Sequence, residues 1–284
     1  MNDVSFLNYN GKIHRSNDLL IQADNRSFRY GDGFFETMKM INGKIILSEF
    51  HFERLFASLE ILKFQRPNYF TKEYLEESIV ALTKKNIHDK LARIRLTIFR
   101  GNGGLYDAQN NTPNYIVQSW SLNNESNSFN ENGLVIDIFK EAKKACDNFS
   151  HIKSNNYLAY AMAALWAKQN RLNDALLLNS GERIADATIA NIFIIKDGII
   201  KTPALTEGCI SGVMRKYLLQ CFREKNIVAE ESQITVDDIF NAKEVFLTNA
   251  IFGIKWVKQA GEKMYENSTA SMLHKKFIIP LFSK

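Results

Sequence analysis

Three stretches that lie far apart in the chain hold the side chains best suited to chemistry. They are residues 30–37 with 49–55 (YGDGFFET and EFHFERL), residues 151–157 (HIKSNNY), and residues 184–193 with 208–215 (IADATIANIF and GCISGVMR). Their lysine, arginine and aspartate are residue types that serve as nucleophiles, anion-binding groups and charged partners. Each has an ordinary explanation when taken alone, since Gly-Asp-Gly usually forms a turn and a single lysine usually lies on the surface. Their shared order and spacing are far more specific.

In this order the three stretches resemble the fold-type IV enzymes that use pyridoxal 5′-phosphate (PLP), the class-IV aminotransferase family. That family contains branched-chain aminotransferases, D-amino acid aminotransferases and 4-amino-4-deoxychorismate lyases. The resemblance covers about residues 9–257, nearly the whole chain. It implies an α+β fold of two domains with the active site between them, PLP as cofactor, a small-molecule substrate and a homodimer.

The resemblance assigns the groups that bind the cofactor at its two ends. Lys153 falls on the lysine that holds PLP as a Schiff base, a role that suits an amine whose pKa is lowered by partial burial. Arg54 falls on the arginine that binds the cofactor phosphate. The same phosphate should meet backbone N–H groups at the start of a helix, where Gly212, Val213 and Met214 lie.

The remaining cofactor contacts are also implied by the resemblance. Asp186 falls where the family usually has the glutamate that keeps the pyridine nitrogen protonated. Because aspartate is one methylene shorter, its strand must lie closer or the contact must be longer or water-bridged. Tyr157 is a candidate for the phenolic oxygen of the cofactor, and Thr188, Asn249 and Ala250 complete the predicted cofactor site.

Three short segments favour the lyases within the family. Residues 248–251 (TNAI), 212–215 (GVMR) and 100–104 (RGNGG) resemble the corresponding lyase motifs. In related dimers the segment at 100–106 approaches the neighbouring active site. The predicted substrate-binding residues are Tyr30, Arg95, Arg100 and Tyr106. Arg95 is explained equally well as a surface residue of a strand.

The implied reaction is conversion of 4-amino-4-deoxychorismate to 4-aminobenzoate and pyruvate, a step of the folate pathway. The main alternative is an aminotransferase for branched-chain or D-amino acids, which Glu36 fits well. A PLP-binding protein without turnover and a basic nucleic-acid binder are further alternatives, and the latter lacks a basic stripe.

The composition is that of an ordinary globular chain of 284 residues, with 45% hydrophobic and 24% charged residues. The net charge is +5, but the lysine pairs lie far apart among acidic residues. The three cysteines fit neither a disulfide framework nor a metal motif, the first residues lack the layout of a secretory signal, and no apolar run matches a membrane span. We therefore expect a cytoplasmic protein with no metal and with neither nucleic acid nor membrane as a partner.

Hydrophobic periodicity predicts the elements that must position these residues. Helices are expected over residues 48–64, 71–86, 156–170, from Gly212 to about Glu224, and around 268–278, with Ser48 as a helix N-cap. Strands are expected over 92–99, 114–120 and 134–139, and hairpins at residues 10–11 and 42–43. The polar segment 123–132 is predicted to link a smaller N-terminal domain (1–122) to a larger C-terminal domain (133–284).

Overall fold

The computed structural model describes residues 5–106 and 111–283. The chain divides into two compact units: unit 1 comprises Met1–Ser126 and Lys153–Asn156, and unit 2 comprises Asn127–Ile152 and Tyr157–Lys284. The chain first passes from unit 1 to unit 2 after residue 126, which lies inside the predicted linker. The return of residues 153–156 to unit 1 has no counterpart in the predicted domain boundaries.

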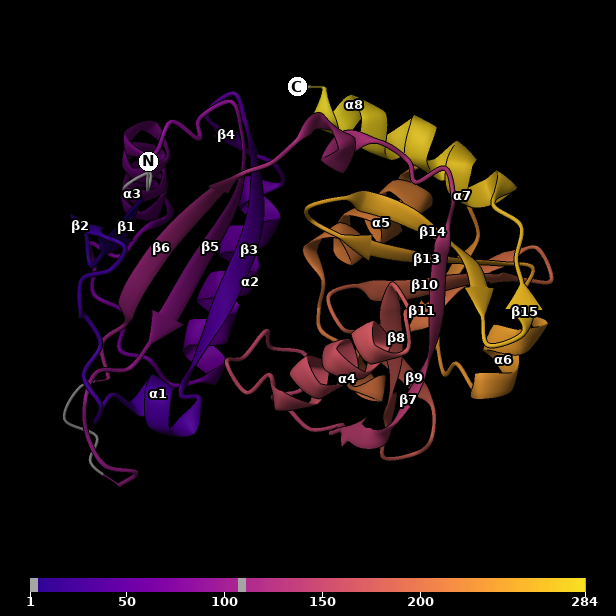
Figure 1. Cartoon of the computed structure of the whole chain (residues 1–284), viewed down its shortest axis with the longest axis horizontal. Helices are drawn as coiled ribbons and strands as arrows, with labels where there is room; N and C mark the ends of the chain where they lie inside the picture. Colours follow the sequence, from indigo (N-terminus) through magenta and orange to yellow (C-terminus); the bar gives the residue numbers. More distant parts are fainter. Residues whose placement is uncertain (1–4, 107–110, 284) are drawn as a thin grey trace. The chain divides into compact units, whose positions relative to one another are not determined.

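Unit 1 is built on a six-stranded antiparallel sheet in the order β2-β1-β6-β5-β3-β4 (Figure 1). Its strands are β1 (Phe6–Tyr9), β2 (Lys12–Arg15), β3 (Gly33–Ile41), β4 (Lys44–Ile45), β5 (Leu91–Phe99) and β6 (Asn114–Ser121). Both predicted hairpins are confirmed. In each, the Asn and the Gly of the turn have positive φ, as a type I′ turn requires.

The helices of unit 1 are α1 (Arg26–Tyr30), α2 (Ser48–Ile61) and α3 (Lys72–Lys85). The helices predicted over 48–64 and 71–86 are confirmed as α2, which contacts β3, and α3, which contacts β1 and β6. The prediction that Ser48 caps α2 is wrong. Leu47 occupies the N-cap position with φ 56°, while the Ser48 hydroxyl donates to the Glu76 carboxylate on α3.

The two faces of this sheet carry different side chains. Successive residues of a strand point to opposite faces, and β3 pairs with β5 so that Thr37 lies opposite Arg95. Glu36 points toward α2, where its carboxylate meets Arg54. Phe35 and Arg95 therefore share the face turned away from α2.

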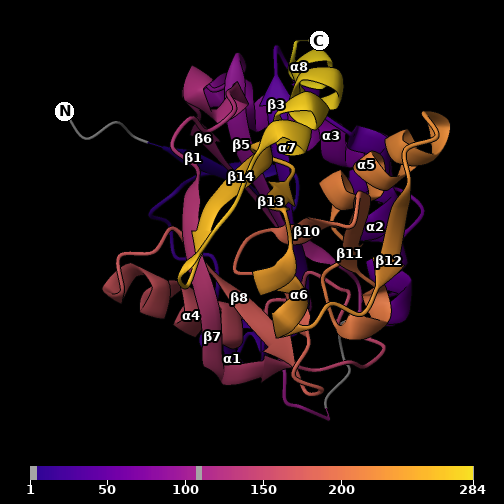
Figure 2. The ribbon, with the colours of Figure 1, turned by 90° about the vertical axis from the view of Figure 1, so that its right-hand side faces the viewer.

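Unit 2 is built on a nine-stranded mixed sheet in the order β12-β11-β10-β13-β14-β7-β8-β9, with β15 paired to β14 (Figures 1 and 2). Its strands are β7 (Leu134–Lys144), β8 (Asp174–Asn179), β9 (Ile184–Ala187), β10 (Asn191–Lys196), β11 (Ile199–Pro203), β12 (Ala229–Ser232), β13 (Glu244–Asn249), β14 (Gly253–Ala260) and β15 (Lys263–Met264). Because β9 also contacts β10 and β11, the sheet curls back on itself.

Helices pack against the strands of this sheet. They are α4 (Leu158–Gln169), α5 (Val213–Glu224), α6 (Val236–Asn241), α7 (Ser268–Leu273), a π-helical turn (His274–Ile278) and α8 (Ile279–Phe282). α4 contacts β7 and β8, and α5 contacts β12 and β13. An apolar core runs beneath the strands and includes Ile136, Leu176, Ile192 and Val257.

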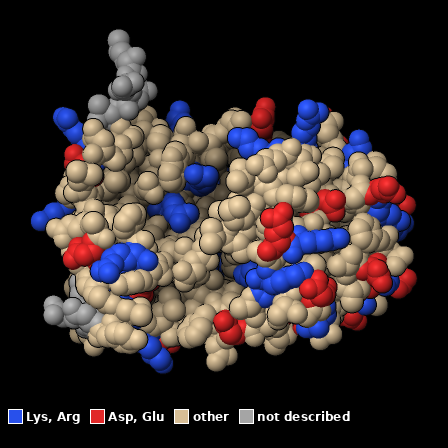
Figure 3. Space-filling view, turned by 60° about the horizontal axis from the view of Figure 1, so that its bottom comes forward, with Lys and Arg blue, Asp and Glu red and all other residues tan. Residues whose placement is uncertain are grey.

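The surface has no single sign of charge on the face shown in Figure 3, where basic and acidic side chains are interspersed over both units. Among residues 5–106 and 111–283, no helix combines the length and hydropathy that crossing a membrane requires.

Candidate active site

The segment that carries Lys153 is held beside the first residues of β3. The Lys153 carbonyl accepts a hydrogen bond from Phe35 N at 2.9 Å, and Asn155 N donates to the Gly33 carbonyl at 2.9 Å. The Lys153 ammonium group lies 4.7 Å from the centroid of the Phe35 ring, and its side chain is half-buried. Gly33 permits this close approach, because a Cβ there would lie 2.7 Å from Asn155 Nδ2 and also 2.3 Å from the Ile98 carbonyl oxygen on β5.

Arg54 is held by a buried acid on the neighbouring strand. Its Nε donates to Glu36 Oε1 at 2.7 Å and its Nη2 donates to Glu36 Oε2 at 2.6 Å. His51, one turn earlier on α2, places Nδ1 2.7 Å from the same Oε2. Glu36 and His51 are fully buried, so the plane of the guanidinium is fixed from the protein side.

The charges in this cluster are set by burial and pairing. Burial favours the neutral form of Glu36, but Arg54 and His51 outweigh it and lower the pKa of Glu36 to about 2. Burial lowers the pKa of His51, and the bond to Glu36 offsets this only in part. Glu36 is thus ionised and His51 neutral, and the neutral ring donates through Nδ1.

Asp186 lies on β9 in unit 2, buried with only 1% of its surface exposed. Its Oδ2 accepts from the Tyr160 hydroxyl at 2.9 Å and from Ile210 N at 3.0 Å. Lys144 donates in turn to the Tyr160 hydroxyl. A buried carboxylate that receives such donors is stabilised in its charged form.

Tyr157 and Thr188 support the same region. The Tyr157 hydroxyl donates to the Thr188 carbonyl at 2.9 Å, and the Tyr157 ring stacks on Tyr160 with centroids 4.3 Å apart. Both the amide and the hydroxyl of Thr188 donate to Asp174 Oδ1. Thr188 therefore fixes the backbone next to Asp186.

The start of α5 is packed so closely that only glycine fits at its N-cap. Gly212 takes the N-cap position, Val213 and Met214 are the first helical residues, and α5 is 12 residues long. A Cβ on Gly212 would lie 1.8 Å from Asn191 Oδ1, and the Asn191 amide donates to the Ile210 carbonyl at 2.8 Å. The open N–H groups and dipole at such a helix start favour an anion.

Asn249 and Ala250 lie in the turn that follows β13. Asn249 Oδ1 accepts from Ile251 N at 2.9 Å and from Phe252 N at 3.0 Å, while its amide donates to the Ile189 carbonyl at 3.2 Å. The side chain of Asn249 thus fixes the turn and ties it to the loop after Asp186.

The four predicted substrate residues, all in unit 1, have different surroundings. The Arg95 guanidinium lies 3.6 Å from the centroid of the Phe35 ring, which also contacts Lys153. Tyr30, at the end of α1, contacts the guanidinium of Arg29 at 5.0 Å, and Tyr106 is almost fully exposed.

The Arg100 guanidinium is engaged within its own unit. It donates to Asp32 at 2.5 Å, to Asn111 at 3.1 Å and to the Leu62 carbonyl, and it stacks on Phe64. These contacts tie the Arg100 side chain to the segments that follow α1 and α2, so its guanidinium is already engaged.

Sequence reasoning missed several supporting residues of this site, namely Glu36 as the partner of Arg54, His51, Lys144, Tyr160 and Asn191. One signal was available, since Glu36 is an acid in a strand whose side chains are mostly apolar. A buried acid in such a strand calls for a cationic partner.

Each unit carries groups of the kind that bind and activate a phosphorylated aromatic aldehyde. Unit 1 presents an amine and a fixed guanidinium, and unit 2 presents a buried carboxylate and an open helix start. These are the groups needed for an imine, a phosphate and a protonated ring nitrogen.

Comparison with known proteins agrees with this chemistry. Residues 33–260 match the family model described as amino-transferase class IV. The chain is 27% identical over 271 residues to a putative branched-chain-amino-acid aminotransferase of Methanocaldococcus jannaschii, covering 94% of this chain and 92% of that protein. It is also 27% identical over 236 residues to the aminodeoxychorismate lyase of Vibrio harveyi, covering 82% of this chain and 85% of that protein.

A solved structure shows the same fold. The branched-chain aminotransferase of Thermoproteus uzoniensis superposes with a TM-score of 0.87 at 19% identity, covering 99% of this chain and 96% of that one. This likeness confirms the predicted α+β fold of the fold-type IV enzymes. The family match confirms the resemblance seen in the three motif stretches, and the chain belongs to the amino-transferase class IV family of enzymes.

Proposed function

We propose that this enzyme carries PLP on Lys153 and converts 4-amino-4-deoxychorismate to 4-aminobenzoate and pyruvate. The observation that carries the cofactor assignment is the Arg54 guanidinium, fixed in its plane by a buried and ionised Glu36. Burying the Glu36 charge is unfavourable because the carboxylate loses its hydration, and the fixed guanidinium that results suits a bound phosphate dianion.

The proposed contacts follow from the residues of each unit. Arg54 and the amides of Val213 and Met214 bind the phosphate, and Asp186 pairs with the ring nitrogen. Tyr157 is the proposed partner of the phenolic oxygen, although its hydroxyl must then exchange its bond to the Thr188 carbonyl. When bound, PLP supplies an electron sink for the carbon next to the substrate nitrogen.

The chain's own groups then move the protons. The Lys153 amine, released from the cofactor when the amino group of the substrate takes its place, would take the proton from the substrate carbon that bears the nitrogen, and the enolpyruvyl group would leave with its oxygen. Lys153 or water returns a proton to give pyruvate. Because the six-membered ring becomes aromatic, the elimination is downhill, and Arg95 is proposed to hold a substrate carboxylate.

Support for the lyase over an aminotransferase comes from the turn at Thr248, Asn249 and Ala250, which resembles the Asn-Ala-Leu run of the lyases. Asn249 fixes that turn through its two accepted hydrogen bonds. The Vibrio harveyi relative carries the name of the same activity.

An aminotransferase acting on branched-chain or D-amino acids is the second candidate. Glu36, which fits the transaminase side of the family resemblance, and the relative from Methanocaldococcus jannaschii favour it. The two candidates differ in whether an amino-group acceptor is needed.

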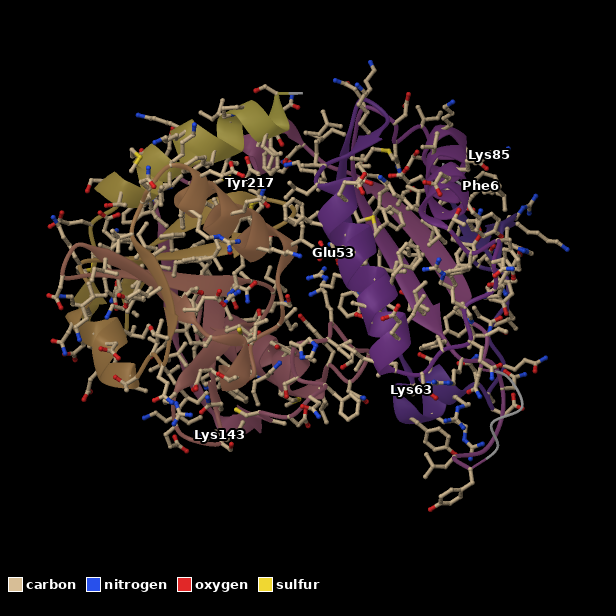
Figure 4. All side chains as sticks on the ribbon, turned by 180° about the vertical axis from the view of Figure 1, so that it is seen from behind. Phe6, Glu53, Lys63, Lys85, Lys143 and Tyr217 are labelled. Carbon is tan, nitrogen blue, oxygen red and sulfur yellow. The ribbon has the colours of Figure 1, made fainter. Side chains whose placement is uncertain are left out.

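A pyruvate assay separates the two activities. We expect pyruvate from 4-amino-4-deoxychorismate with no 2-oxo acid present; turnover only with both an amino donor and a 2-oxo acid would establish the aminotransferase instead. Lys153→Ala should abolish the visible absorption band of the bound cofactor. Lys143→Ala, at an exposed lysine paired with Glu182 (Figure 4), should keep the band.

We also propose that the enzyme is a homodimer whose 100–106 segment approaches the neighbouring active site. The almost fully exposed Tyr106 ring supports a contact there. Light scattering of the wild type and of Tyr106→Ser measures the mass, and a monomeric wild type would refute this proposal.

A further inference from the structure

We propose that Tyr160, with Lys144 behind it, is a positioning residue that keeps Asp186 ionised and oriented toward the ring nitrogen of the cofactor. This inference rests on the proposed function, because it assigns a task at the same site. The three residues form a relay within unit 2, from an ammonium group through a phenol to a carboxylate.

Geometry defines the direction of the relay. Lys144 donates to the Tyr160 oxygen, so the proton of that hydroxyl is directed at Asp186 Oδ2, 2.9 Å away. The Lys144 ammonium group also lies 4.5 Å from the centroid of the Tyr160 ring. The backbone N–H of Ile210 is a second donor to the same oxygen at 3.0 Å. The positive charge of Lys144 therefore acts on Asp186 through one polarised hydroxyl.

Tyr160 is a dependable donor because it does not ionise. Burial and the nearby charge of Asp186 raise the pKa of Tyr160 well above its usual value. The titratable groups facing the phenol are Lys144, Asp186, Tyr157, whose ring stacks on it, and the Cys209 thiol. Its ring is fixed by the stack on Tyr157 and by burial to 4% exposure within the core under α4.

The relay fixes the charge and the orientation of Asp186, a carboxylate that is one methylene shorter than the glutamate usual in the family. A carboxylate that must hold a proton on a ring nitrogen has to stay ionised in a buried place and keep one orientation. Two donors on Oδ2 set both properties from the protein side. Tyr160 thus acts on the cofactor through Asp186.

Tyr160→Phe is the direct test, since phenylalanine keeps the ring, the stack and the buried volume while it removes the hydroxyl. Asp186 would then retain a proton more readily and leave the ring nitrogen neutral. A neutral ring withdraws fewer electrons from the C=N link to Lys153, so that link becomes more basic. We expect the pH at which the cofactor band titrates to rise by about one unit, and PLP to dissociate about tenfold more readily.

Matched variants separate this role from a structural one. Tyr265→Phe removes the hydroxyl of another buried tyrosine of unit 2, which donates to the Ile239 carbonyl at 2.9 Å. It should leave the titration and the PLP affinity unchanged. Lys144→Met should shift the titration in the same direction as Tyr160→Phe by a smaller amount, and it serves as the test if Tyr160→Phe does not fold.

The outcomes distinguish the two proposals. If the wild type forms the band, and Tyr160→Phe and Lys144→Met both match it in titration and in PLP affinity, the relay is overturned and the proposed function stands. A wild type that forms no band with PLP overturns the proposed function and the relay together. A shift confined to the Tyr160 and Lys144 variants, with Tyr265→Phe unchanged, supports the relay.

Discussion

The carboxylate of Glu36 meets the guanidinium of Arg54 side-on, with Nε 2.7 Å from Oε1 and Nη2 2.6 Å from Oε2. A bidentate pair of this kind fixes direction as well as charge. Because Glu36 lies in the middle of a strand and Arg54 on a helix, the pair also joins the sheet of unit 1 to α2.

Glu36→Gln should weaken both the fold and the site. The amide cannot neutralise the Arg54 guanidinium, and breaking a buried ion pair by removing one partner costs about 3–5 kcal/mol. We expect a loss of about 3 kcal/mol in the free energy of unfolding of the apo protein, measured by urea denaturation. PLP affinity should fall about 10- to 100-fold as Arg54 loses its fixed orientation.

Glu60→Gln is the matched control, since Glu60 is an exposed acid on the same helix. It should leave the free energy of unfolding and the free energy of PLP binding within about 0.5 kcal/mol of the wild type. An equally stable Glu36→Gln protein with wild-type PLP affinity would contradict the role of the pair.

Gly212→Ala should disturb the phosphate end of the site. The added methyl group would meet Asn191 Oδ1 at 1.8 Å, so α5 must shift at its first turn. We expect PLP affinity to fall at least about tenfold, measured by titration of the absorption band. Gly181→Ala is the control, because there the nearest atoms belong to the flexible end of Arg183. Restored affinity in Gly212→Ala with Asn191→Gly would confirm the steric cause.

Arg95→Met should raise KM for the substrate. A charge-assisted hydrogen bond to a carboxylate contributes about 1.5–3 kcal/mol, which corresponds to about a 10- to 100-fold rise. Arg93→Met is the matched control on the same face of β5, where the guanidinium lies 4.4 Å from the Trp120 ring. Steady-state kinetics of both variants should show the rise for Arg95 alone, and equal effects would point to general loss of positive charge.

Lys39 should make the stability of the fold depend on pH. It is fully buried on β3, its ammonium group donates to the Ser126 carbonyl at 3.1 Å, and burial lowers its pKa to about 7. Between pH 7 and the ordinary lysine value near 10.4 the unfolded chain binds more protons here than the folded chain. The free energy of unfolding should therefore rise with pH across that window.

Lys39→Met tests this dependence, because methionine fills similar space without a charge. The variant should be more stable than the wild type at pH 7, by about 1–2 kcal/mol, and the difference should shrink by pH 9.5. Lys85→Met replaces an exposed lysine that lies over Phe6 (Figure 4) and should show no such trend. A constant difference between Lys39→Met and wild type at both pH values would refute the explanation.

Local patterns predicted the elements well. The helix around Leu75, Ile79 and Leu82 follows from helical spacing of apolar residues and from Thr71, which caps it by accepting from Tyr74 N. The hairpin turns follow from Asn-Gly pairs. These features depend on residues within a few positions of each other, which is the range that a sequence pattern reports.

The supporting residues of the site were not predictable in this way. Glu36 and Arg54 are 18 residues apart, and Arg100 and Asp32 are 68 apart. Their contacts exist only once strand registers are fixed, and register depends on the whole buried face of a sheet. The family resemblance named Lys153, Arg54 and Asp186 but not the residues that hold them.

The hydrogen bonds of the Lys153 segment to Gly33 and Phe35 carry a consequence for synthesis on the ribosome. Domains of a nascent chain generally fold from the N-terminus as they emerge. Here the edge of β3 next to residues 33–35 receives its partner only from residues 153–156, after some two dozen residues of unit 2 have been made. The N-terminal half therefore leaves the ribosome with an open strand edge, and its last step of folding adds the lysine itself.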